Sequence, residues 1–337
     1  MTDDAIKASN IKIVPKGTLL MSFKLTLGRT AFADCDLYTN EAIASLPIKN
    51  DRILDKYFLK YALGAIDLEK EVDNAVKGKT LNKQKLKNLG IPLPPLQEQK
   101  RIVAKLDALF ERIDQAIALH QQKIDEADAF MGSVLNEVFG ELEGRYKKVP
   151  LFDVADVARG KSKHRPRNDK KLFGGEYPFI QTGDVRNANR YISSYSNTYS
   201  EFGLKQSKLW NKGTICRTIA ANIGDVAVLD MDSCFPDSVV GIYSEKNSNE
   251  YLYFFLLTIK QQLESKATTT AQMNINLKVL QTIGVPLPPL KTQQKTVTYL
   301  DQLSVKIEQV KALQTQKMQR LKDLKASLFD RAFRGEL

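Results

Sequence analysis

The sequence predicts an α+β protein in which two mixed, β-rich domains are joined by two long antiparallel coiled-coil helices. Three observations carry this prediction. A proline-rich phrase occurs twice, a long apolar seam with helical spacing follows each copy, and strand-like segments of similar sequence precede each copy. A chain of 337 residues has room for two domains that each bury a core of their own.

The repeated phrase reads IPLPPL at Ile91–Leu96 and VPLPPL at Val285–Leu290. Proline fixes its own φ angle and disfavours helix in the residue before it. Both copies are therefore predicted to be extended straps, which carry the chain from a globular domain into the start of a helix.

Each strap leads into a stretch whose apolar residues recur in steps of three and four. A seam sustained over about forty residues is typical of a coiled coil, and such a helix is roughly 60–65 Å long. Neither helix can bury its stripe alone, so we predict that the two pair. The seam residues are Leu106, Leu109, Ile113, Ile124 and Met131 in the first copy and Leu300, Leu303, Ile307, Val310, Met318 and Leu321 in the second.

One position of the seam is polar in both copies. His120 falls in the first seam at the place where Gln314 falls in the second. A polar residue in a coiled-coil seam commonly fixes the register of the helices, and we prefer this interpretation to metal binding.

The globular parts also match each other. KGT at Lys16 aligns with KGT at Lys212, and each predicts a turn that leads into an alternating strand. A glycine follows twelve residues after each lysine, at Gly28 and Gly224. Amphipathic helices are predicted further along, at Tyr57–Leu63 and Tyr253–Ile259.

These patterns divide the chain into four segments. Residues 1–90 are a first globular domain, 91–143 a strap and central helix, 144–284 a second globular domain, and 285–337 a strap and C-terminal helix. The range Lys148–Asn211 precedes the second KGT, whereas fifteen residues precede Lys16. The first domain is therefore expected to be N-terminally incomplete.

Charge is the most informative part of the composition. Lys and Arg number 50 against 39 Asp and Glu, which leaves a formal net charge of +11 and a pI near 9.3. Such an excess favours an anionic partner, either nucleic acid or a membrane surface. No apolar run is long enough to span a bilayer, and the polar, acidic N-terminus is unlike a secretory signal. The three scattered cysteines fit reduced thiols, so a cytoplasmic protein is expected.

The sequence contains no recognisable catalytic motif. The chain has no Asn-Pro-Pro-aromatic motif of an amino-methyltransferase and no phosphate-binding loop. Pro236-Asp237 followed by Glu245-Lys246 lacks the spacing of a nuclease motif, although a metal-dependent nuclease that uses Asp237 remains a competing hypothesis. We expect no enzyme activity, no cofactor and no metal.

Two phrases indicate a family. IPLPPLQEQKRIVAKLDALF (Ile91–Phe110) and YPFIQTGDVRN (Tyr177–Asn187), together with the duplicated layout, make the chain similar to specificity subunits of type I restriction–modification systems. The resemblance implies that each globular domain is a target-recognition domain, which reads one half of a bipartite target in double-stranded DNA. It also implies that the paired helices set the spacer and bind two adenine methyltransferase subunits, which a motor-nuclease subunit joins. The subunit itself performs no chemistry.

The short first domain departs from the family pattern and leaves two alternatives open. Two copies of the chain could form a homodimer and read a symmetric target through the second domain. The chain could instead be a coiled-coil scaffold that binds other proteins.

Candidate DNA contacts lie in polar loops. The densest positive stretch, from Arg159 to Lys171, has seven basic residues and one Asp. Arg and Lys grip phosphates and Arg can pair with guanine, whereas the competing interpretation is a solvated charged loop. In the second domain the candidates are Arg159, Lys161, Lys163, Arg165, Arg167, Lys170, Lys171, Thr182, Arg186, Arg217, Thr218, Asn222, Lys266, Thr268, Thr269 and Gln272; in the first they are Lys24, Arg29, Lys77 and Lys79.

Overall fold

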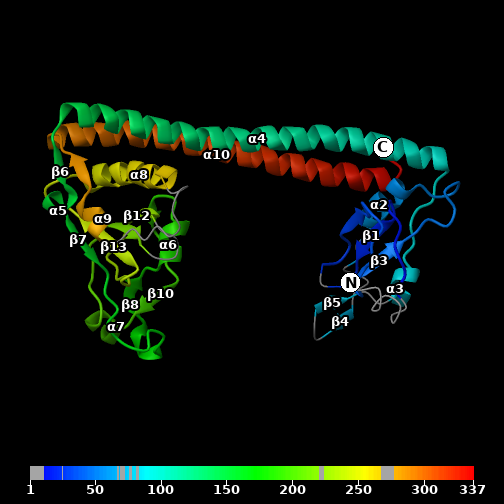
Figure 1. Ribbon diagram of the computed structural model, residues 1–337, viewed down its shortest axis with the longest axis horizontal. Helices are drawn as coiled ribbons and strands as arrows, with labels where there is room; N and C mark the ends of the chain where they lie inside the picture. The colour runs from blue at the N-terminus through cyan, green and yellow to red at the C-terminus, as the bar shows by residue number, and fades with distance from the viewer. Residues whose placement is uncertain are drawn as a thin grey trace. The chain divides into compact units, whose positions relative to one another are not determined.

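A computed structural model describes residues 11–24, 26–66, 68, 73–75, 78–80, 83–219, 224–266 and 277–337. The chain forms two compact units, the first from residues 1–122 with 313–337 and the second from residues 123–312. Two long helices, α4 (Leu96–Arg145) and α10 (Leu290–Phe333), contribute to both units (Figure 1). The predicted mixed α and β character is confirmed in each unit. The division into four segments stays a prediction.

The remaining elements of the first unit are short. They are β1 (Leu19–Ser22), β2 (Thr30–Phe32), β3 (Ile43–Leu46), α2 (Lys56–Ala65), β4 (Asp73–Ala75), β5 (Gly78–Thr80) and α3 (Lys83–Lys87). The central strand β1 pairs antiparallel with β2 and β3. The core between this sheet and α2 contains Leu19, Met21 and Leu63, and the far side of α2 packs through Phe58 and Ala62 against α4 and α10.

The second unit holds a larger sheet. The strands of the second unit are β6 (Lys148–Pro150), β7 (Asp156–Arg159), β8 (Phe173–Phe179), β9 (Tyr191–Ile192), β10 (Asn197–Tyr199), β11 (Ile215–Thr218), β12 (Val226–Leu229), β13 (Val239–Tyr243) and β14 (Gly284–Pro286). Besides α4 and α10, its helices are α5 (Leu151–Val154), η2 (Lys170–Leu172), α6 (Thr182–Asn187), α7 (Glu201–Lys205), α8 (Asn249–Lys266) and α9 (Leu277–Gln281). The main sheet has the order β7-β13-β11-β12-β9.

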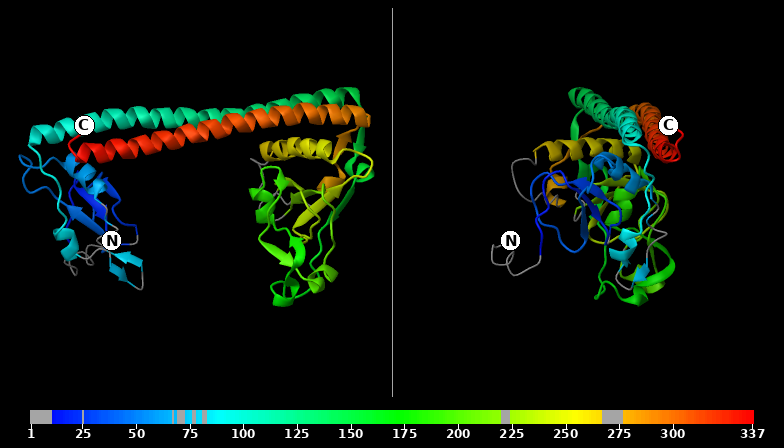
Figure 2. Two further views of the ribbon diagram at one scale, coloured as in Figure 1. Left: turned by 180° about the vertical axis from the view of Figure 1, so that it is seen from behind. Right: turned by 90° about the vertical axis from the view of Figure 1, so that its right-hand side faces the viewer.

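Two apolar layers enclose the main sheet of the second unit. One face packs against α8 and the adjoining parts of α4 and α10, and Figure 2 shows α8 beside α10. The other face packs against α6 and the only tryptophan of the sequence, Trp210. Both layers rest on strands of fully buried residues, β11 and β12. Every residue of β12 is apolar, whereas β11 also buries Arg217 and Thr218.

The strands β1, β2 and β3 of the first unit correspond residue by residue to β11, β12 and β13 of the second. Met21 of β1 lies opposite Thr30 and Ala44, and Arg217 of β11 lies opposite Val226 and Val240 at the same offset in the chain. Both predicted turns are confirmed.

The loop that follows each central strand closes in the same way. The N–H of Gly28 donates to the carbonyl of Ser22 at 2.9 Å, and the N–H of Gly224 donates to that of Thr218 at 2.9 Å. Both glycines have positive φ angles, 75° and 91°, which a residue with a Cβ rarely adopts.

The long helices pair antiparallel, as predicted. In the first unit Lys325 donates to Asp114 at 2.7 Å and His120 contacts Gln314 at 2.6 Å. In the second unit Lys311 donates to Asp128 at 2.8 Å. The contact of His120 with Gln314 supports a role in setting the register.

The burial of the seam follows the predicted spacing with one exception. Leu106, Ile113, Leu300 and Ile307 are buried, and Leu109, Ile124, Met131, Leu303, Met318 and Leu321 are half-buried. Val310 is 45% exposed, so its assignment to the seam was wrong. The neighbouring Lys311 is half-buried and pairs with Asp128, because the helical register turns this position toward α4.

A buried glutamine fixes the first strap to its globular domain. Gln99 is completely buried at the start of α4. Its Oε1 accepts the N–H of Asp55 at 2.8 Å, and its Nε2 donates to the carbonyls of Ile53 and Pro94, both at 2.8 Å. The side chain therefore ties the N-terminus of α2 to the strap.

The second strap has an equivalent glutamine. Gln293 is 1% exposed. It accepts the N–H of Ser248 at 3.0 Å and donates to Asn247 at 3.1 Å and to the carbonyl of Pro288 at 2.9 Å. Here the N-terminus of α8 is tied to the strap.

Replacing either strap glutamine with alanine is expected to lower the free energy of unfolding of its unit by about 2 kcal/mol, because buried hydrogen-bonding groups are left without partners. Hydrogen exchange at Asp55 and Ser248 should accelerate in Gln99→Ala and Gln293→Ala, respectively. The exposed Gln97 and Gln294 provide matched controls. Equal effects in the controls would show that the buried contacts contribute nothing.

Candidate nucleic-acid interface

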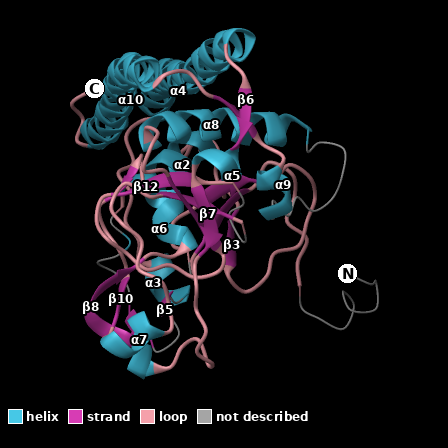
Figure 3. Ribbon diagram, turned by 90° about the vertical axis from the view of Figure 1, so that its left-hand side faces the viewer, coloured by secondary structure: helices cyan, strands magenta, loops and turns pink. Residues whose placement is uncertain are grey.

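The basic loop between β7 and β8 is the candidate interface, and the surrounding structure holds it in place. The N–H of Lys163 donates to the carbonyl of Gln206 at 3.1 Å. The hydroxyl of Ser207 donates to the carbonyl of Lys161 at 2.8 Å. Figure 3 shows α7, β8 and β10 in the part of the second unit away from α8. The loop is therefore attached to this end of the unit.

Two arginines of the loop hold its shape. Arg165 donates from Nη1 to the carbonyls of Ser162 and His164 at 2.7 and 2.8 Å. Arg167 pairs at 2.9 Å with Asp237, which lies two residues before β13. Both arginines remain exposed, so each combines an internal contact with a solvent-facing edge.

A third contact involves the loop's histidine. His164 Nε2 lies 2.9 Å from Asp169 Oδ2, and the N–H of Lys171 donates to Asp169 Oδ1 at 3.0 Å. The hydrogen bond from Lys171, and then the contact with His164, lower the pKa of Asp169. The His164 ring packs edge-on against Phe202 of α7, with centroids 5.2 Å apart.

The other basic residues of the loop face solvent. Among the described residues, no ion pair joins the side chains of Arg159, Lys161, Lys163, Lys170 or Lys171, and all five are exposed. Fixed cations without internal partners are suited to bind phosphate groups.

Two further lysines, which no sequence pattern had singled out, lie beside this loop. Lys205 ends α7, whose C-cap residue Gln206 holds the loop, and Lys208 follows shortly. Both are exposed. Lys208 lies 3.7 Å above the Trp210 ring. The sequence offered one indication of Lys208, because this lysine lies two residues before the only tryptophan, Trp210.

Other predicted contacts are less accessible. Arg217 and Thr218 are fully buried in β11, because the central strand of a sheet with two packed faces exposes neither side. Thr218 Oγ1 accepts the N–H of Asp225 at 3.0 Å and thereby closes the adjacent loop. Neither side chain can reach DNA in this structure. The prediction that Arg217 and Thr218 contact DNA was therefore wrong.

Arg217 has an unusual environment. Among the residues that the structure describes, none of its three guanidinium nitrogens has a hydrogen-bond partner. Burial lowers the pKa of Arg217 to about 10. The equivalent residue of the first unit is Met21, which is also buried.

The remaining candidates are scattered. Thr182 is half-buried at the start of α6, Arg186 is exposed in the same helix, Lys24 is half-buried and Arg29 is exposed beside β2. Lys79 lies in β5 and Lys266 in α8, but their side chains are outside the described part. Outside the described residues altogether are Lys77, Asn222, Thr268, Thr269 and Gln272.

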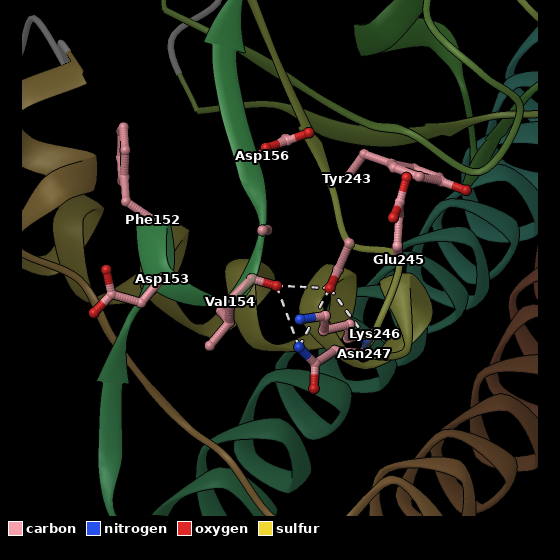
Figure 4. A pocket seen from close by; sticks show the side chains of 10 residues that line it. Phe152, Asp153, Val154, Asp156, Tyr243, Glu245, Lys246 and Asn247 are labelled. Atoms are coloured by element: carbon pink, nitrogen blue, oxygen red, sulfur yellow. Dashed lines mark hydrogen bonds between the residues drawn. The ribbon is translucent and has the colours of Figure 1, made fainter.

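The acidic residues considered for catalysis do not form a catalytic group. Asp237 pairs with Arg167. Glu245 and Lys246 border a pocket of about 230 Å³ between α5 and the end of β13 (Figure 4). There Ser244 and Asn247 donate to the carbonyl of Val154 at 2.6 and 3.2 Å, which fixes the turn. No cluster of His, Cys, Asp and Glu fit to hold a metal occurs in the described ranges.

The fold and the basic loop define a class of protein: two duplicated α+β units on paired long helices, with exposed cations on the second unit. The chain belongs to the type I restriction modification DNA specificity domain family, whose model matches residues 1–128 and 143–317. Within the described ranges, no helix has the length and apolar composition of a membrane span.

Several curated relatives carry names of the same kind. The chain is 25% identical over 327 residues to the type I restriction enzyme EcoBI specificity subunit of Escherichia coli, covering 88% of this chain and 69% of that protein. It is 24% identical over 277 residues to the EcoKI specificity subunit of E. coli K12, covering 74% and 58%. For a Methanocaldococcus jannaschii protein named as the MjaX specificity subunit, identity is 27% and the chain spans 64% of the relative's length.

Solved structures share the fold. One chain, from a study of complex assembly and conformational transition of the type I R-M system, has a TM-score of 0.76 and 24% identity, over 97% of this chain and 84% of that chain. The HsdS subunit from Thermoanaerobacter tengcongensis gives a TM-score of 0.55 at 24% identity, over 97% and 83%. At this identity the likeness concerns the fold alone.

Proposed function

We propose that this chain is a DNA sequence-specificity subunit of a type I restriction–modification complex and has no catalytic activity of its own. The observation that carries the proposal is the anchored loop of the second unit, which exposes five basic side chains that form no ion pair with any described residue. Family membership supports DNA as the anionic partner. A subunit of this kind would act in the cytoplasm, where it can reach DNA.

Exposed apolar side chains on the long helices support protein partners. In the first unit Leu119 is 59% exposed. In the second unit Phe130 and Val305 are 54% and 57% exposed. Large apolar side chains on an otherwise charged helix are typical of binding surfaces. We assign these faces to two methyltransferase subunits and, through them, the motor-nuclease subunit.

Selection of duplexes from a randomised library by the purified chain tests DNA reading. We expect an enriched motif and binding that weakens steeply with salt. An asymmetric two-part motif would mean that both units of one chain read DNA, and a palindrome would mean that a homodimer reads through the second unit. Absence of enrichment with salt-independent binding would contradict the proposal and favour a protein-binding scaffold.

The double variant Lys161→Ala/Lys163→Ala is expected to reduce the slope of log Kobs against log salt by about 2, because each phosphate contact contributes about 0.9. Arg165→Ala and Arg167→Ala should also weaken binding, partly by releasing their internal contacts. Fluorescence anisotropy with the selected duplex measures both effects. Lys105→Ala/Lys322→Ala, on the long helices, is the control, and an unchanged slope in the loop variant would exclude the loop from the interface.

A further inference from the structure

The two straps have nearly the same sequence and very different exposure. In the second unit Val285 is completely buried, and Pro286 and Pro288 are also buried. In the first unit Pro92 is exposed and Leu93 is 54% exposed. The two straps are too similar in sequence for the sequence to explain this contrast in exposure. The contrast must therefore come from the segments that cover each strap.

A neighbouring strand covers the second strap. The strand β6 pairs antiparallel with β14, and Val149 lies opposite Val285. The N–H of Leu151 donates to the carbonyl of Ile283 at 2.9 Å, and the N–H of Leu287 donates to that of Lys147 at 3.3 Å.

The covering segment has apolar anchors. Leu151 is completely buried in the core of the second unit. Tyr146 and Val149 also pack against that core. The segment from Tyr146 to Leu151 reads YKKVPL and follows directly from the end of α4.

In the first unit no described strand covers the corresponding edge. Among the described residues, no strand pairs with Gly90–Pro92. The positions equivalent to Ile283 and Leu287 are Leu89 and Leu93. Unpaired backbone groups of this kind are ready to accept a further strand.

An apolar pocket of about 430 Å³ adjoins this edge. Its lining includes Phe58, Leu93, Ile102 and Phe333. The helix α10 ends at Phe333, and Leu337 packs against the same core as Ile91 and accepts a hydrogen bond from Arg101 at 2.7 Å. In the second unit α4 instead continues to Arg145 and delivers the covering segment. The first unit thus retains a surface that a covering strand could bind, but none of its described residues forms such a strand.

We propose that the strap edge, Leu89–Leu93 with this pocket, is a docking site for an extended segment of a partner polypeptide. The segment would add an antiparallel strand and insert apolar side chains, with the pattern aromatic-Lys-Lys-Val-Pro-Leu that the second unit displays. This chain's own Tyr146–Leu151 is already engaged in the second unit. The docking does not depend on DNA reading.

A labelled peptide with the sequence of residues 144–155, GRYKKVPLFDVA, tests the proposal on the full chain. Fluorescence anisotropy should show saturable binding with one peptide per chain. Leu93→Asp should weaken binding by about tenfold or more, since it places a charge in an apolar contact. Ile13→Asp, at an equally exposed apolar residue of the same unit that does not line the pocket, should leave the peptide affinity unchanged, and a peptide with Val149→Asp and Leu151→Asp should not bind.

Hydrogen exchange locates the bound peptide. Protection should appear at the Leu93 amide and stay constant at Leu287. Absence of saturable binding, or equal binding by Leu93→Asp and the wild type, would overturn the proposal. So would loss of protection at Leu287, because it would show that the peptide had exchanged with β6 in the second unit.

Discussion

Replacing Arg190 with methionine is expected to lower the free energy of unfolding of the second unit by about 2–4 kcal/mol. The guanidinium of Arg190 donates to both Glu250 of α8 and Asp301 of α10. Methionine keeps a similar length but leaves the two carboxylates close together without their cation. Loss of a partly buried charge partner is costly, and the exposure of Asp301, 39%, places the expected effect below that of a fully buried pair.

The surroundings of Arg190 amplify this effect. Its guanidinium carbon lies 5.3 and 4.8 Å from the ring centroids of Tyr253 and Phe254. Burial acts to lower the pKa of Arg190, and the bonds to Glu250 and Asp301 outweigh it, so that the pKa is raised. The cation therefore joins the main sheet region to α8 and α10.

Urea unfolding followed by Trp210 fluorescence measures the change, because Trp210 is buried in the second unit and is the only tryptophan. A double-mutant cycle with Asp301→Asn separates the ion pair from the stacking. A loss below about 0.5 kcal/mol would place Arg190 among ordinary surface residues.

Replacing Arg217 with methionine is expected to raise the free energy of unfolding by about 1–3 kcal/mol, because it removes a buried charge that has no partner among the described residues. The equivalent strand position of the first unit already holds a methionine, Met21, so the side chain suits this sheet. Trp210 fluorescence again reports the unfolding. Arg159→Met, at an exposed arginine, is the control.

The pH dependence of Arg217 gives a second test. Its pKa in the folded protein, about 10, lies below the ordinary value of 12.5, so the unfolded chain binds more protons at high pH. Wild-type stability should therefore rise relative to Arg217→Met as the pH passes about 10. A destabilised Arg217→Met variant would instead show that the folded protein supplies an anionic partner to this residue.

Local patterns in the sequence were sufficient to predict the straps, the paired helices and the matching turns. Prolines set the straps at Ile91–Leu96 and Val285–Leu290, because proline restricts the backbone whatever surrounds it. The spacing of Leu106, Ile113 and Leu300 predicted the paired helices, since burying a stripe on a long helix requires a partner. Duplication predicted the matching turns at Gly28 and Gly224.

The tertiary structure alone decided what each polar residue and each strap does. Arg165 is bound within the loop, Arg167 is paired with Asp237, and Lys161 has no ion-pair partner among the described residues. Arg217 lies inside the sheet, although all four read alike as basic residues in polar segments. The two straps differ because a strand covers only the second among the described residues. Burial and pairing depend on segments distant in the sequence, so no local pattern could reveal them.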